Sequence, residues 1–107
     1  MKDNIAYIIE LAERSECIDF KKVRIVDICY TESYMKKILK RVEDAMDRSK
    51  YFVVVNKINN MNKVNMDKLI DLVDNDTIVT MKWILESIIY CGHGETIYNT
   101  ALGWMYE

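Results

Sequence analysis

The sequence predicts an all-α fold, a compact bundle of four to six helices around a central apolar helix at residues 77–91. The chain has 107 residues, no proline and only three glycines, and turn-rich sandwiches and barrels favour both residue types. Apolar residues also recur at helical spacing along most of the chain. Half of the residues are hydrophobic, which is enough to bury one core, so we expect a single globular domain over residues 1–107.

The first segment, residues 3–16, is predicted to form an amphipathic helix. Its apolar residues follow the i, i+3, i+4, i+7 spacing of a buried helix face: Ile5, Ile8, Ile9 and Ala12. Glu10 falls on the opposite side of such a helix and is expected to face water.

Two segments, 23–30 and 51–55, are rich in β-branched and aromatic residues, which favour strands. The first also keeps helical spacing at Val23, Val26 and Tyr30, so we predict a helix over residues 18–30. A strand needs a partner, and each segment is the one candidate partner of the other. The alternative is therefore an α+β fold with a two-stranded element from 23–30 and 51–55.

Thr31 begins the longest predicted helix. A heptad-like seam of apolar residues runs along it: Met35, Leu39, Val42 and Met46. Residues 56–65 contain five asparagines and predict a loop, because asparagine tolerates turn conformations. Asn65 is expected to cap a short helix that ends near residue 74.

Residues 77–91 have almost no polar face, which is typical of a helix surrounded by other helices. Three of its residues are predicted core residues: Ile84, Leu85 and Ile88. Gly92 is expected to end this helix in a left-handed conformation, and a final helix is expected to start near Glu95.

Charge is distributed unevenly along the chain. Residues 20–63 carry eleven bases and five acids, although the whole chain has a net charge of −2. On the predicted basic helix 36–50, a candidate basic strip of Lys37, Arg41 and Arg48 shares one face and could contact phosphates. Acidic residues between these bases and a pI near 5.4 weigh against nucleic-acid binding. A nucleic-acid-associated regulator is therefore the alternative function.

The sequence offers no catalytic, cofactor-binding or metal-binding signature. Cys91 and His93 lie two residues apart, but no third group can be identified that would orient a thiolate–imidazole pair. The other cysteines, Cys17 and Cys29, form no Cys-x-x-Cys pair, and a single histidine cannot complete the usual zinc patterns. We therefore expect free thiols, no metal and no cofactor. A small enzyme using Cys91 and His93 is the weakest hypothesis.

Three aromatic residues of the last predicted helix form the candidate interface: Tyr98, Trp104 and Tyr106. Tyr and Trp are enriched at protein interfaces. We therefore expect a small non-enzymatic protein-interaction or adaptor protein that forms a two-fold homodimer and can bind another protein. The N-terminus lacks a signal-peptide layout, and no apolar stretch reaches the roughly 20 residues that span a bilayer. We therefore expect a cytoplasmic protein without membrane contact.

Overall fold

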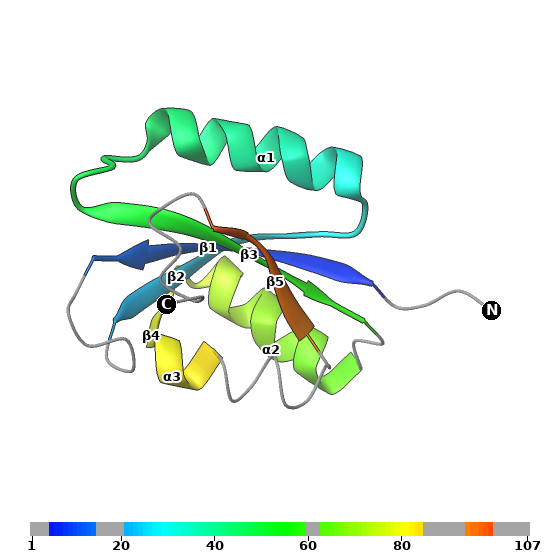
Figure 1. The fold of residues 1–107 in the computed structure, drawn as a ribbon. Helices are drawn as coiled ribbons and strands as arrows, with labels where there is room; N and C mark the ends of the chain where they lie inside the picture. Colours follow the sequence, from blue (N-terminus) through cyan, green and yellow to red (C-terminus); the bar gives the residue numbers. More distant parts are fainter. Residues whose placement is uncertain (1–4, 15–20, 60–62, 85–93, 100–107) are drawn as a thin grey trace.

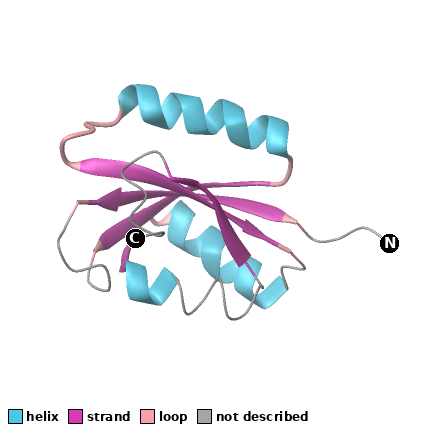
Figure 2. Cartoon of the chain, in the orientation of Figure 1, coloured by secondary structure: helices cyan, strands magenta, loops and turns pink. Residues whose placement is uncertain are grey.

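In the computed structural model the chain is an α+β protein with one five-stranded antiparallel sheet and helices on both of its faces (Figures 1 and 2). The structure describes residues 5–14, 21–59, 63–84 and 94–99, with the backbone alone at 63–65 and 94–99. The prediction of an all-α bundle is therefore wrong.

The sheet has the strand order β4-β2-β1-β3-β5, with every neighbouring pair antiparallel. Its strands are β1 (Ala6–Glu13), β2 (Lys22–Cys29), β3 (Tyr51–Ile58), β4 (Ile78–Thr80) and β5 (Gly94–Asn99). The helices are α1 (Glu32–Ala45), α2 (Lys63–Asp74) and α3 (Met81–Ile84). Helix α1 covers one face of the sheet, and α2 and α3 cover the other (Figure 1). The central element is therefore β1 and not a helix.

Two covered faces explain why β1 was mistaken for a helix. Ile8 and Ile9 are adjacent and both fully buried, but Ile8 packs on the α2–α3 side and Ile9 on the α1 side. A strand buried on both faces is apolar without alternation. Its apolar residues then also satisfy helical spacing by chance. The same holds for β3, where Phe52 to Val55 are all buried.

The described residues form two core clusters, which the sheet separates. The cluster on the α1 side contains Tyr7, Ile9, Cys29, Met35, Ile38, Leu39, Val53 and Val55. The cluster on the α2–α3 side contains Ala6, Ile8, Ala12, Val23, Ile25, Ile28, Phe52, Val54, Ile58, Leu69, Met81 and Ile84.

The long helix after Thr31 is confirmed. Thr31 is its N-cap, and the Thr31 hydroxyl accepts a hydrogen bond of 3.2 Å from the Tyr34 N–H. Met35, Ile38 and Leu39 are its buried residues, as the seam predicted. The helix ends at Ala45, so the predicted basic helix 36–50 is too long at its C-terminal end.

The alternative α+β prediction identified the strands but not their pairing. Residues 23–29 lie in β2 and residues 51–55 in β3, so the predicted helix over 18–30 is wrong where the structure describes it, yet β1 separates these two strands. The sequence gives no local signal that β1 lies between them, because the apolar spacing of β1 resembles that of a helix. Strand β3 also continues to Ile58, into the predicted loop, and α2 starts at Lys63. Asn65 therefore lies within α2 and is not its cap.

The predicted central helix is wrong over its first residues. The β-branched run of residues 78–80 forms β4, and the helix α3 follows with Ile84 fully buried. The prediction that Ile84 is a core residue is confirmed, whereas Leu85, Ile88 and Gly92 lie outside the described residues. The predicted final helix is also wrong at its start, because residues 94–99 form β5 and pair with β3.

Candidate functional site

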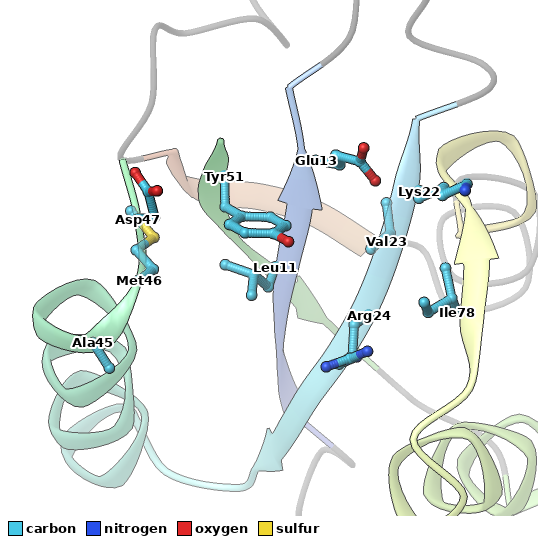
Figure 3. A pocket seen from close by; sticks show the side chains of 10 residues that line it. All are labelled: Leu11, Glu13, Lys22, Val23, Arg24, Ala45, Met46, Asp47, Tyr51 and Ile78. Atoms are coloured by element: carbon cyan, nitrogen blue, oxygen red, sulfur yellow. The ribbon is translucent and has the colours of Figure 1, made fainter. Parts of the chain in front are cut away.

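An open pocket of about 420 Å³ lies on the α1 side of the sheet, beyond the C-terminal end of α1 (Figure 3). Because α1 stops at Ala45, it leaves the neighbouring strand ends uncovered. The lining residues come from β1, β2, β3, β4, the last residue of α1 and the turn after it: Leu11, Glu13, Lys22, Val23, Arg24, Ala45, Met46, Asp47, Tyr51 and Ile78.

The register of the paired strands determines which residues form the floor of this pocket. Leu11 of β1 is the Cα partner of Arg24 in β2, and Arg24 is in turn the partner of Ile78 in β4. These three residues therefore form one row across three strands and share the α1 face. Tyr51, at the start of β3, lies next to Leu11 in Figure 3 and closes the apolar part of the floor.

A hydrogen-bonded turn after the C-terminal end of α1 forms one wall of the pocket. The Asp47 carboxylate accepts hydrogen bonds from the Ser49 hydroxyl at 2.6 Å and the Ser49 N–H at 2.9 Å. These two bonds, the hydroxyl first, lower the pKa of Asp47. The turn is also tied to the end of β1, because the Arg14 N–H donates to the Lys50 carbonyl at 2.8 Å and Arg14 Nε donates to the Arg48 carbonyl at 2.8 Å.

Arg24 is held by the turn that ends α2. Arg24 Nε lies 3.0 Å from Asp76 Oδ1, an ion-pair distance without hydrogen-bond geometry. Asp76 has a positive φ of 52°. The Thr77 N–H bonds to the Leu72 carbonyl and the Asp76 N–H to the Val73 carbonyl, which is the pattern of a Schellman C-cap. The helix cap therefore presents a carboxylate to a residue of the pocket.

The pocket rim combines charge with exposed apolar surface. Glu13, Lys22 and Asp47 are exposed, and they surround a floor in which Leu11 and Tyr51 are half-buried. Ile78 is 52% exposed, which is high for an isoleucine. Apolar surface rimmed by charged groups is typical of a recognition site, and this volume lies within the usual range for ligand pockets.

A second polar feature lies in the core under α2 and α3. Glu10 is fully buried and accepts a hydrogen bond from the Asn56 amide nitrogen, while Glu10 Oε1 is buried without a hydrogen-bond partner. Burial raises the pKa of Glu10 to about 8, and the hydrogen bond from Asn56 offsets part of this rise. Glu10 is therefore mostly protonated at neutral pH.

Both residues of this pair lie at irregular points of the sheet. The β1–β2 register shifts between Ile9 and Glu10, and the β3–β5 register shifts between Val55 and Asn56. Bulges redirect side chains and are common near functional sites. Here they coincide with the one buried carboxyl group among the described residues. Neither Glu10 nor Asn56 lines the pocket beyond α1.

Two cations lie beside one buried aromatic ring. Lys21 Nζ is 5.0 Å and Arg14 Cζ 5.8 Å from the centre of the Phe52 ring, within the range of cation–π attraction. Lys21 is 6% exposed. Burial and then the charge of Arg14 lower the Lys21 pKa. This cluster packs the residue after β1 and the residue before β2 against β3.

The predicted basic strip is not assembled on one helix face, and most of the predicted interface lies outside the described residues. Tyr98 lies in the strand β5, and Trp104 and Tyr106 lie outside the described residues. Lys37 and Arg41 are exposed on α1, whereas Arg48 lies beyond the end of this helix. The three bases therefore do not share one helix face. Cys91 and His93 also lie outside the described residues.

Sequence reasoning missed both the pocket and the buried pair. The pocket combines four strands with one turn, and their adjacency depends on long-range pairing that no motif encodes. Glu10 did carry a signal, because it is the one charged residue between Ala6 and Ala12. An acid inside such a run indicates a buried polar contact if the run is a strand.

Comparisons with protein-family models, with curated proteins and with solved structures found no match to this chain. Within the described ranges, no cluster of three or more His, Cys, Asp or Glu side chains is arranged to hold a metal ion. The same ranges contain no helix with the length and apolar character needed to cross a membrane.

Proposed function

We propose that this chain is a non-enzymatic protein-interaction domain, and that the pocket at the end of α1 receives a bulky apolar side chain of a protein partner. The observation that carries the proposal is Ile78, which is 52% exposed at the pocket rim beside the half-buried Leu11 and Tyr51. Interfaces usually concentrate their binding energy in such apolar anchor positions.

The charges around the pocket favour a peptide segment over an ion. Two bases, Lys22 and Arg24, are balanced by two acids, Glu13 and Asp47, so the pocket has no strong preference for one sign of charge. A peptide with an apolar anchor between polar groups of both signs suits this rim. Polar rims of this kind give specificity and orientation more than affinity.

A library of displayed random peptides tests this proposal. Peptides selected on the wild-type chain are expected to share a bulky apolar residue with polar neighbours. Ile78→Ser should weaken their binding at least about tenfold, which corresponds to roughly 1.4 kcal/mol. Ile70→Ser is the matched control, because Ile70 is also an exposed isoleucine but belongs to α2 on the other side of the sheet. Equal binding by both variants would refute the pocket as the site.

A nucleic-acid-associated function is the second candidate, and the exposed bases of α1 favour it. Lys37 and Arg41 are exposed on this helix, and phosphate contacts make affinity fall steeply with salt. The test is retention on immobilised DNA over a salt gradient. If the wild-type chain is retained and the substitutions Lys37→Glu and Arg41→Glu abolish this retention, the candidate is supported. If the wild-type chain elutes at the lowest salt, the candidate is excluded.

A further inference from the structure

An acidic surface lies where the end of β2 meets α2. Four of its residues are Asp27, Tyr30, Ile70 and Asp74, and with Ile28 and Val73 they line a hollow of about 200 Å³. Tyr30 is 59% exposed and Ile70 37% exposed. Two apolar side chains are thus displayed beside two carboxylates. We refer to these four residues as the acidic surface.

A basic stripe runs along the outer side of α1. Tyr34, Lys37 and Arg41 are all exposed, and their i, i+3, i+7 spacing places them on one side of the helix. Tyr34 is 49% exposed. The side of α1 that carries Met35, Ile38 and Leu39 packs on the sheet, so the stripe is available to a partner.

The two surfaces belong to opposite layers of one chain. Helix α1 lies on one face of the sheet and α2 on the other (Figure 1), so Lys37 and Arg41 cannot reach Asp74 within the same copy. Each surface offers the charge that the other lacks. Three of the four exposed large hydrophobic residues in the described part of the chain also belong to these surfaces: Tyr30, Tyr34 and Ile70.

We propose that a second copy of this chain binds the acidic surface through its basic stripe. The tyrosine and isoleucine side chains form the apolar centre of this contact, and the charged pairs around them set its orientation. Because the contact joins two unlike surfaces, every copy contributes one of each. The contact uses none of the residues that line the pocket, so its failure would leave the peptide-binding proposal intact.

Charge reversal and charge exchange test the contact. The two variants are Asp74→Lys and the double variant Lys37→Glu/Arg41→Glu. Lysine at the last residue of α2 suits a helix C-terminus, and positions 37 and 41 are exposed, so both variants should fold, which circular dichroism verifies. Sedimentation velocity over a concentration series then measures self-association of each variant alone and of their equimolar mixture.

The wild-type chain is expected to self-associate, and more weakly at high salt because screening reduces attraction between charges. Each variant alone should lose at least about tenfold in association constant, because each charge reversal places like charges opposite each other across the contact. The mixture should regain it, because the unchanged basic stripe of the Asp74→Lys variant can then bind the unchanged acidic surface of the Lys37→Glu/Arg41→Glu variant. Arg48→Glu is the control, since Arg48 lies beyond α1, and it should associate like the wild type. A monomeric wild type, or a mixture no better than its components, would overturn the proposal.

Discussion

Glu10 and Asn56 are 46 residues apart in the sequence and share a hydrogen bond inside the core. They belong to the neighbouring strands β1 and β3 and lie where each strand shifts register against its other neighbour. The pair therefore connects the two central strands at their least regular point. Its second carboxyl oxygen lacks a hydrogen-bond partner, which makes the contact sensitive to the charge state of Glu10.

Stability is expected to fall as pH rises, and Glu10 is the cause. Burial raises its pKa from 4.5 to about 8, so the folded state binds this proton more tightly than the unfolded state. The contribution of Glu10 to stability is then fully present below pH 4.5 and falls by about 1.4 kcal/mol per pH unit toward pH 8. The total is about 5 kcal/mol at most, because water penetration and relaxation reduce it.

Urea unfolding at a series of pH values from about 5 to about 9 measures this effect. Glu10→Gln should remove most of the fall, because glutamine stays neutral and can still accept a hydrogen bond from Asn56. Glu13→Gln is the control on the same strand, since Glu13 is exposed. If Glu10→Gln keeps the full pH dependence of the wild type, another group is responsible.

Adjacent residues of β1 should both be essential to the core. Ile8 and Ile9 are fully buried in opposite clusters, so Ile8→Ala and Ile9→Ala should each cost about 2–5 kcal/mol. The two effects should be close to additive in the double variant, because the sheet separates the two cavities. Ile70→Ala, at an exposed position, should cost about 1 kcal/mol or less. An Ile8 or Ile9 variant as stable as the Ile70 variant would contradict a central position of β1.

Helix α1 could be predicted because it is buried on one side only. A helix with one wet face leaves a periodic pattern, and its N-cap Thr31 has the expected residue type. Strands β1 and β3 lack such a pattern because helices cover both faces of the sheet. Their apolar runs fit either structure, and the choice depends on strand pairing between distant segments. Local propensity is a weak guide in that situation.

The candidate pocket could not be predicted for a related reason. Leu11, Arg24 and Ile78 form one row only because β2 lies between β1 and β4. Neither the spacing nor the type of these residues marks them in the sequence. The bases Lys37 and Arg41 were identified correctly as a helical pair, but the helix end at Ala45 separates Arg48 from them.

Cys29 is expected to be unreactive in the folded chain. It is fully buried beside α1, and burial, followed by the charge of Asp27, raises its pKa to about 11. Thiol reagents attack the thiolate, so labelling requires opening of the α1 layer. In a Cys17→Ser/Cys91→Ser variant, the labelling rate at neutral pH should rise with urea in parallel with unfolding. Fast labelling without urea would show that α1 does not cover Cys29.

The last prediction concerns Asp76, where a helix cap and an ion pair compete. Its positive φ of 52° favours glycine by about 1 kcal/mol. Its ion pair with Arg24 joins two partly exposed side chains, and such pairs contribute about 0–1 kcal/mol.

Asp76→Gly should therefore leave stability within about 1 kcal/mol of the wild type. Asp76→Ala loses the ion pair and keeps the backbone strain, so it should be the less stable variant by about 1 kcal/mol. Thermal and urea unfolding compare the two substitutions, and Asp67→Ala reports the effect of removing an exposed acid from α2 away from this turn. A glycine variant less stable than the alanine variant would show that the left-handed conformation of Asp76 is not the limiting feature of this turn. If Asp76→Gly also weakens peptide binding while stability is unchanged, the ion pair orients Arg24 in the pocket.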